Sequence, residues 1–367
     1  MEKTIFDAVI IGAGVIGLAI AKYLSEEGMQ VVVLEKAERS GESTSSRNSG
    51  VIHAGMYYPV NSLKAKLCVE GNSLLYDYAK KKNISFKKIG KYIVSTTKSE
   101  QKKLDHIYEN GKKNFVDLEM INKDSLREKL PYLSAFSGIY SPNTGIIDVP
   151  EFIKSLEFDI WQNDGLISFN TECMKVKKNN KRYEIFCNSS EKFKIDSKLL
   201  INASGLQSYE TLKNFSFLPD KFCHPVYYAK GHYFKYTGKH PFTNLVYPIN
   251  SQSSLGIHVG FDMSGQLRFG PDLEWVKDLN YKFENNVKKK FVKSITSYWP
   301  DLNPEKLQED YVGIRPKIQN KSENMKDFII SGPKDHNFRG FVNLQGIESP
   351  GVTSSLAIGK FVGNLVL

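Results

Sequence analysis

The fold is decided near the start of the chain by residues 5–35, which read IFDAVIIGAGVIGLAIAKYLSEEGMQVVVLE. An apolar run over 5–11 predicts a strand, apolar positions with helical period over 15–27 predict a helix, and 30–35 predicts a second strand. A glycine-rich turn joins the first strand to the helix. This order of elements predicts a right-handed βαβ unit and therefore a parallel sheet.

The turn carries the pattern Gly-x-Gly-x-x-Gly at Gly12, Gly14 and Gly17. The first glycine permits the tight turn, the second lets a pyrophosphate approach the backbone, and the third lets helix and strand pack closely. The phosphates would face the helix N-terminus, whose N–H groups and dipole favour anions. Glu35 stands at the end of the second strand, where its carboxylate would accept hydrogen bonds from a ribose. Together these features predict a dinucleotide-binding site.

The composition is that of a globular protein, with 41% hydrophobic and 25% charged residues in a chain of 367. This length suits one large domain or two joined domains. Because no apolar stretch is long enough to span a bilayer and the N-terminus lacks the features of a secretory signal, we expect a cytoplasmic protein. The net charge of +10 favours anionic substrates and is compatible with peripheral association on the inner face of a membrane.

Metal and nucleic-acid sites are not expected. The four cysteines are scattered without the spacing of a zinc site, so we expect free thiols and no metal. Lysine runs at 80–82 and 288–290 lack a recognition motif or interleaved aromatic residues. They are better interpreted as solvated helix faces.

The rest of the chain predicts a second domain. A helical period over 63–82 is followed by strand-like patterns over 86–97 and 166–201, and by alternation typical of antiparallel strands over about 220–275. Residues 346–367 predict a glycine loop that opens a helix. We therefore expect an α/β protein whose Rossmann-like cofactor domain (1–85, 145–215, 315–367) is interleaved with a substrate domain on a mostly antiparallel sheet (86–144, 216–314).

Three further segments point to the kind of dinucleotide. After Arg39 and Gly41 the chain reads TSSRNSG over 44–50, then LINASG over 200–205 and GIESPGVTSS over 346–355. With the glycine turn, these segments resemble the D-amino-acid oxidase superfamily of flavoproteins, which implies FAD. A helix beginning near 351 would stabilise the charge that develops on the reduced flavin ring. The predicted FAD-binding residues are Gly12, Gly14, Val15, Ile16, Gly17, Glu35, Lys36, Thr44, Ser45, Ser46, Asn48, Ser49, Gly50, Val51, Cys173, Ala203, Gly205, Gly346, Gly351, Val352, Thr353 and Ser354.

Other phrases narrow the resemblance. They read NSGVIHAGMYY over 48–58, SLKAKLC over 62–68, AKGHYF over 229–234, LGIHV over 255–259, RFGP over 268–271 and GIRPK over 313–317. They resemble L-2-hydroxyglutarate dehydrogenases and oxidases. The resemblance implies oxidation of a 2-hydroxy diacid to 2-oxoglutarate, with hydride passing from Cα to flavin N5 and electrons going on to quinone, oxygen or another acceptor. The segment Gly346-Ile347-Glu348 departs from the pattern.

A 2-hydroxy acid needs a cation for its carboxylate and a base for its hydroxyl proton. Arg315 is the predicted carboxylate anchor, because a guanidinium can make two parallel hydrogen bonds and an arginine in this setting binds carboxylate in amino-acid-oxidising relatives. Candidates for a distal carboxylate are Tyr57, Lys66 and Lys230. The base is His53 or His258, since histidine is suited to proton transfer near neutral pH. His53 could alternatively carry covalently attached flavin.

Three alternatives share the same scaffold. A glycine, sarcosine or D-amino-acid oxidase would use the same carboxylate anchor but needs no hydroxyl base. A glycerol-3-phosphate dehydrogenase would need a phosphate pocket. A flavin-binding protein without turnover would need neither anchor nor base, because fold does not dictate function.

Overall fold

The computed structural model describes residues 5–249 and 256–367, which form two compact units. Unit 1 comprises residues 1–46, 149–228 and 315–367, and unit 2 comprises 47–148 and 229–314. The expected boundaries differ mainly at 47–85, which the structure assigns to unit 2. The reason is strand pairing: β3 (Val51–Ile52) and β4 (Phe86–Lys87) both pair with β8 (Gly145–Ile147).

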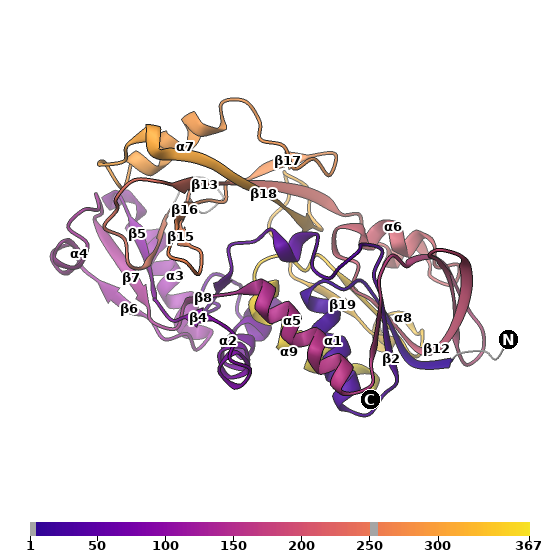
Figure 1. Cartoon of the computed structure of the whole chain (residues 1–367). Coiled ribbons are helices and arrows are strands. Elements are labelled where there is room, and N and C mark those ends of the chain that lie inside the picture. Colours follow the sequence, from indigo (N-terminus) through magenta and orange to yellow (C-terminus); the bar gives the residue numbers. More distant parts are fainter. Residues whose placement is uncertain (1–4, 250–255) are drawn as a thin grey trace. The chain divides into compact units, whose positions relative to one another are not determined.

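Unit 1 is built on a sheet whose centre is parallel, as the opening βαβ pattern predicted (Figure 1). Strand β1 (Ile5–Ile11) lies between β2 (Val31–Leu34) and β12 (Lys192–Asn202) and runs parallel to both. Strands β9 (Leu166–Ser168) and β20 (Phe341–Gln345) extend the parallel part. The antiparallel additions are β10 (Glu172–Lys178), β11 (Tyr183–Asn188) and β19 (Ile329–Ser331).

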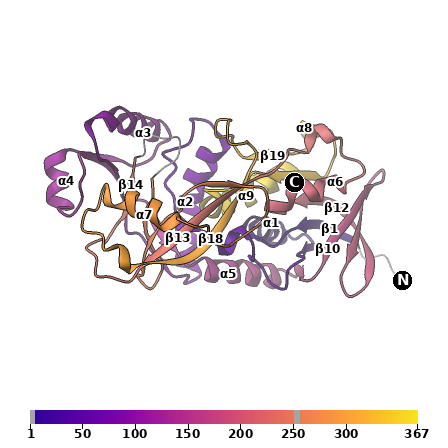
Figure 2. The same cartoon turned by 90° about the horizontal axis from the view of Figure 1, so that it is seen from above.

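Three long helices belong to unit 1. Helix α1 (Val15–Glu26) packs against both α5 (Val149–Gln162) and α9 (Gly351–Val366), as Figures 1 and 2 show. The contact with α9 is close, because a Cβ added to Gly359 would lie 2.5 Å from the carbonyl oxygen of Ala19. The short helical elements are η1 (Thr44–Ser46), η3 (Gly205–Gln207), α6 (Ser208–Lys213), η4 (Asp220–Phe222) and α8 (Pro333–His336).

Unit 2 contains the expected mostly antiparallel sheet. Its strand order is β17-β13-β16-β15-β14-β5-β7-β6, and β18 also pairs with β13. Of the strand pairs whose register the structure describes, β14 and β5 are parallel and the others are antiparallel. The strands are β5 (Lys91–Ser95), β6 (Glu119–Ile121), β7 (Ser137–Ser141), β13 (Tyr227–Tyr236), β14 (Leu245–Pro248), β15 (Val259–Phe261), β16 (Leu267–Phe269), β17 (Glu274–Val276) and β18 (Leu307–Lys317).

The helices of unit 2 are α2 (Leu63–Lys81), α3 (Gln101–Lys113), α4 (Lys123–Lys129) and α7 (Val287–Thr296), with short turns η2 (Lys98–Glu100) and η5 (Pro304–Lys306). Phe234, Phe269, Phe291 and Trp299 are buried in one aromatic core. The α/β class with two kinds of sheet is therefore confirmed.

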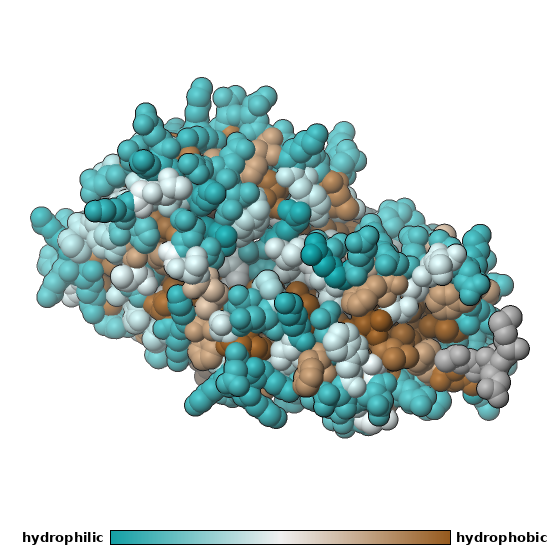
Figure 3. Space-filling view, in the orientation of Figure 1, coloured by the Kyte–Doolittle hydropathy of each residue, from teal (hydrophilic) through white to brown (hydrophobic). Residues whose placement is uncertain are grey.

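The surface is mainly hydrophilic on the face shown in Figure 3, and hydrophobic residues gather in unit 1 near the position of β2 in Figure 1. Exposed large hydrophobic side chains of unit 1 include Phe158 and Trp161 of α5 and Leu166 of β9. Among the residues that the structure describes, no helix is both long enough and apolar enough to cross a membrane.

Candidate functional site

The glycine turn of unit 1 leaves no room for a side chain at its first and third glycines, Gly12 and Gly17. Gly12 has a φ of +103°, and a Cβ on it would lie 2.7 Å from the Ala203 carbonyl oxygen. A Cβ on Gly17 would lie only 1.9 Å from the carbonyl oxygen of Gly12. Both conflicts are with backbone, so neither a rotamer change nor a small side-chain shift can relieve them. The turn brings β1, the start of α1 and the end of β12 together.

Two side chains hold this turn in place. The carboxylate of Glu35 accepts hydrogen bonds from the backbone N–H of Ala13 (2.7 Å) and Ala37 (2.9 Å). The hydroxyl of Ser45 accepts one from the N–H of Val15 at 3.0 Å, while the N-cap residue Gly14 provides no side-chain cap. The N-terminus of α1 is thus open to an anion in the way that a pyrophosphate site requires.

A second helix of unit 1 also begins without a side-chain cap. Helix α9 starts at Gly351 after Pro350, and Thr353 and Ser354 are fully buried on it. Within the described part of the chain, the buried hydroxyl of Ser354 has no hydrogen-bond partner. A buried polar atom without a partner is costly, so a bound polar group would satisfy it. These features fit a dinucleotide held by the two helix N-termini.

The remaining predicted cofactor residues are divided between the units. In unit 1, Lys36 donates a hydrogen bond to Gln207, and Cys173 is buried in β10 opposite Cys187, inside a hydrophobic core. Gly205 has a positive φ of 57° in the turn after β12. Unit 1 also holds Val15, Ile16, Thr44, Ser46, Ala203, Gly346 and Val352, and unit 2 holds Asn48, Ser49, Gly50 and Val51.

The unusual Glu348 is neutralised within unit 1. Its carboxylate forms an ion pair with Lys317, with a shortest distance of 2.6 Å, and both residues are buried. Mutual pairing of this kind offsets the cost of burying each charge. Glu348, which the sequence suggested as a departure from the family pattern, therefore has its own counter-charge.

Unit 2 brings together two of the predicted histidines and one predicted tyrosine around a lysine that the sequence did not single out. We call His53, Tyr57, Lys91, Tyr247 and His258 the Lys91 cluster. The Nζ atom of Lys91 lies 4.8 Å from the ring centre of Tyr57 and 4.6 Å from that of Tyr247. The Tyr247 ring stacks on His258 at 3.5 Å between centroids. His258 lies directly before β15, rather than within a strand as expected.

The cluster has unusual electrostatics. Burial lowers the pKa of Lys91 to about 7, although the neighbouring Cys68 opposes this shift. Desolvation, together with the nearby Lys91 charge, lowers the pKa of His53 to about 3. The His53 imidazole is therefore neutral at physiological pH. Its backbone carbonyl accepts a hydrogen bond from Asn72 Nδ2 at 2.9 Å, which helps to fix the segment.

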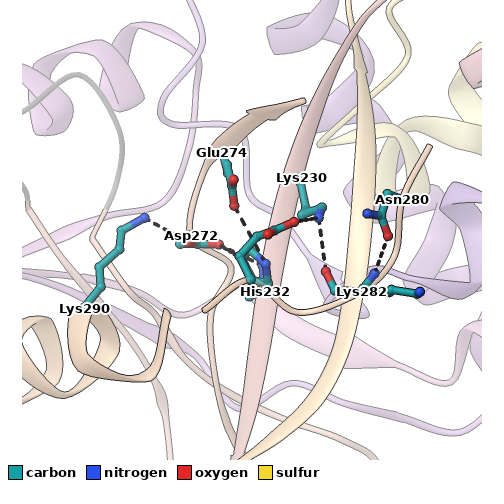
Figure 4. A network of polar contacts seen from close by, with 8 residues as sticks. Lys230, His232, Asp272, Glu274, Asn280, Lys282 and Lys290 are labelled. Carbon is teal, nitrogen blue, oxygen red and sulfur yellow. Dashed lines mark hydrogen bonds and ion pairs between the residues drawn. The ribbon is translucent and has the colours of Figure 1, made fainter. Parts of the chain in front are cut away.

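The other two lysine candidates have different surroundings. Lys66 is exposed on α2. Lys230 is fully buried on β13, where its Nζ atom forms an ion pair with Glu284 (2.8 Å) and donates to the carbonyl of Lys282 (3.1 Å). Figure 4 shows Lys230 in a polar network with His232, whose Nδ1 atom is 2.9 Å from Asp272 Oδ1.

The charges of this network are largely paired among its own members, although the buried Nε2 atom of His232 has no hydrogen-bond partner among the described residues and lies 3.9 Å from Glu274 Oε2. The other carboxylate oxygen of Asp272 accepts a hydrogen bond from Lys290 at 2.8 Å. Burial opposes ionisation of Asp272, but hydrogen bonds from His232 and Lys290 outweigh it and lower the pKa of Asp272 to about 2. With its charge already paired with Glu284, Lys230 offers less to an incoming carboxylate than its sequence context suggested.

Arg315 lies on β18 and is partly exposed. Arg315 begins the segment 315–367 of unit 1, whereas the Lys91 cluster belongs to unit 2.

The sequence did not predict a role for Lys91, because the segment KYIVS over 91–95 has an ordinary lysine at its edge. The structure supplies what the sequence did not: the strand that begins with this lysine is buried along its whole length.

Comparison with known proteins agrees with this geometry. A family model described as FAD dependent oxidoreductase matches residues 7–365. The L-2-hydroxyglutarate dehydrogenase, mitochondrial, of Arabidopsis thaliana is 37% identical over 408 residues, covering 100% of this chain and 84% of the relative. The protein of the same name from Homo sapiens is 26% identical, covering 98% of this chain and 88% of the relative.

Solved structures share the fold. Dithionite-reduced L-alpha-glycerophosphate oxidase from Mycoplasma pneumoniae with FAD bound superimposes with a TM-score of 0.89 at 26% identity, covering 100% of this chain and 95% of that one. Glycine oxidase from Geobacillus kaustophilus gives a TM-score of 0.83 at 19% identity, covering 99% and 95%.

Proposed function

This chain belongs to the family of FAD-dependent oxidoreductases, and on that premise we propose that it oxidises L-2-hydroxyglutarate to 2-oxoglutarate. The observation that carries the proposal is the 37% identity, along the whole chain, to a plant protein named L-2-hydroxyglutarate dehydrogenase. The Lys91 cluster supports it, because a hydroxy diacid needs both a cation and a group that accepts a proton.

The residues of unit 1 would hold the cofactor. The N-terminus of α1, held by Ser45, would receive the pyrophosphate, and Glu35 would accept hydrogen bonds from the ribose while it holds the turn. The N-terminus of α9, with Ser354, would meet another polar part of the same group. When bound, FAD supplies the acceptor for the hydride that the substrate loses.

Two side chains would act on the reacting end of the substrate. Arg315 would orient the C1 carboxylate through parallel hydrogen bonds. His53 would accept the hydroxyl proton, since burial keeps its imidazole neutral. A dianionic substrate would counter the Lys91 charge and raise the pKa of His53, which makes the imidazole a better base in the complex. His258 is the second candidate, although its Nε2 atom is enclosed by protein.

Arg315→Lys should lower kcat/KM for L-2-hydroxyglutarate by about 5- to 150-fold, or about 1–3 kcal/mol, because a lysine cannot reproduce the planar fork. Steady-state kinetics with a dye as acceptor would measure the change. Arg339→Lys, at an exposed arginine of the same unit, is the matched control. If Arg315→Lys keeps FAD and wild-type kinetics, Arg315 does not bind the carboxylate.

The substrate is tested by following flavin absorbance without oxygen. L-2-hydroxyglutarate should bleach the flavin and the D isomer should not. Bleaching by glycine, sarcosine or D-amino acids instead would point to an amine oxidase. Glycerol 3-phosphate belongs in the panel because a structural relative is named as a glycerophosphate oxidase. If no compound bleaches bound flavin, a non-catalytic flavoprotein becomes the better interpretation.

The acceptor of the electrons is proposed to be quinone, oxygen or an electron-transfer protein. Peripheral association of a cytoplasmic protein with the inner face of a membrane is supported by exposed Phe158, Trp161 and Leu166 and by the net charge of +10. Oxygen uptake compared with reduction of a quinone analogue would identify the acceptor. Flotation with anionic vesicles would test the association, and protein that stays at the bottom of the gradient would contradict it.

A further inference from the structure

Lys91 is a buried lysine that forms no ion pair with any residue that the structure describes. It has no exposed surface, and within the described ranges its Nζ atom has no hydrogen-bond partner. The faces of Tyr57 and Tyr247 attract the ammonium but offer it no carboxylate oxygen. Two other buried lysines are paired with carboxylates: Lys230 with Glu284 and Lys317 with Glu348.

The described titratable groups next to Lys91, namely His53, Tyr57, Cys68 and Tyr247, do not provide a negative charge at neutral pH. Burial raises the pKa of the Cys68 thiol to about 12, and it raises the pKa values of the Tyr57 and Tyr247 hydroxyls above their usual range. The low pKa of His53 keeps its imidazole neutral. His258 stacks on the Tyr247 ring.

The tyrosine whose ring faces Lys91 Nζ also carries a hydrogen-bond donor. The hydroxyl of Tyr57 is buried and, among residues 5–249 and 256–367, it also has no hydrogen-bond partner. An ammonium and a hydroxyl that both lack acceptors match a carboxylate, whose two oxygens only accept. Three residues of the Lys91 cluster, His53, Tyr57 and His258, are only partly buried, whereas Lys91 itself and the Tyr57 hydroxyl are enclosed.

We propose that Lys91 Nζ and the Tyr57 hydroxyl bind the second, distal carboxylate of the substrate and so make the enzyme selective for dicarboxylates. This inference rests on the proposed function. It assigns to Lys91 the role that the sequence offered to Lys66 or Lys230. The Tyr57 hydroxyl donates to one carboxylate oxygen while the ammonium supplies the charge.

The test compares two substrates of equal length on the FAD-loaded protein. L-2-hydroxypentanoate has a methyl group where L-2-hydroxyglutarate has its distal carboxylate. In Lys91→Met, kcat/KM for the diacid should fall by about 10- to 150-fold, the scale of a charged hydrogen bond, while kcat/KM for the monoacid stays within about threefold. Binding of glutarate, followed through the flavin spectrum, should weaken by a similar factor while binding of pentanoate does not change.

The variant is expected to fold. Burial lowers the pKa of Lys91 to about 7, so the lysine binds its proton more weakly in the folded protein than in the unfolded chain. At neutral pH the buried lysine therefore destabilises the folded state. Removing the charge should raise the thermal unfolding midpoint. Tyr57→Phe, which deletes only the hydroxyl, should weaken glutarate binding by about 2- to 10-fold, as expected for a neutral hydrogen bond.

The pH dependence provides an independent readout. Lys91 is protonated below its pKa of about 7, so kcat/KM for the diacid should decline as the pH rises through that value. The decline should be absent for the monoacid and in Lys91→Met. His53, Cys68, Tyr57 and Tyr247 do not titrate in this range, because their pKa values lie well away from neutrality.

Controls separate the possible failures. Lys112→Met, at an exposed lysine of α3, should behave as wild type. If Lys66→Met or Lys230→Met removes the preference for the diacid while Lys91→Met retains it, the inference is wrong. If Lys91→Met binds glutarate as wild type does, the inference is also wrong. Failure of the wild-type protein to oxidise L-2-hydroxyglutarate would instead contradict the proposed function.

Discussion

Gly17→Ala is expected to yield protein without bound FAD. The added Cβ would lie 1.9 Å from the carbonyl oxygen of Gly12, a backbone atom in the turn between β1 and α1, so no side-chain movement can relieve the conflict. Relieving the conflict must move the helix away from the strand and so displace the N–H groups at its N-terminus. The ratio of flavin to protein absorbance after purification measures this, and we expect it to fall close to zero.

Gly28→Asn is the matched control for Gly17→Ala. Gly28 follows the C-terminus of the same helix with a φ of +80°. Its chain neighbours aside, no atom of the described residues lies within 4 Å of the position of its Cβ, and asparagine tolerates this conformation. This variant should keep its FAD at a stability cost of at most about 1 kcal/mol. A Gly17→Ala protein that binds FAD as tightly as wild type would show that the turn does not form the cofactor site.

His53→Gln is expected to reduce kcat for L-2-hydroxyglutarate by about 10²- to 10⁴-fold, the usual range for removing a general base. Glutamine keeps a polar side chain of similar reach but cannot take the hydroxyl proton. Because Arg315 and Lys91 remain, KM should change little. Rapid-mixing measurement of flavin reduction would report the chemical step directly, apart from reoxidation by the acceptor.

His258→Gln is the companion to His53→Gln. If only His258→Gln loses the reductive step, His258 is the base and the assignment to His53 is wrong. Acid denaturation of the wild-type protein separates the base role from the alternative role of His53 as a covalent flavin ligand. Flavin released into the supernatant agrees with a base, whereas flavin that stays on the precipitated chain points to attachment.

The sequence by itself determined the features that depend on neighbouring residues. Gly12, Gly14, Gly17 and Glu35 lie within one βαβ unit, so their spacing alone predicts the turn, the helix N-terminus and the dinucleotide, and the FAD family is confirmed. The parallel and antiparallel sheets could be predicted for the same reason, because periodicity is a local property of the chain.

Only the tertiary structure decided which charges are compensated. Lys230 forms an ion pair with Glu284, and Lys317 forms one with Glu348, although the partners are far apart in sequence. Lys91 instead packs against the rings of Tyr57 and Tyr247. No local pattern distinguishes these lysines, since burial and pairing arise from contacts between segments remote in sequence. The cost of a buried, unpaired charge depends on those contacts alone, and it is this cost that distinguishes Lys91 as the candidate substrate ligand.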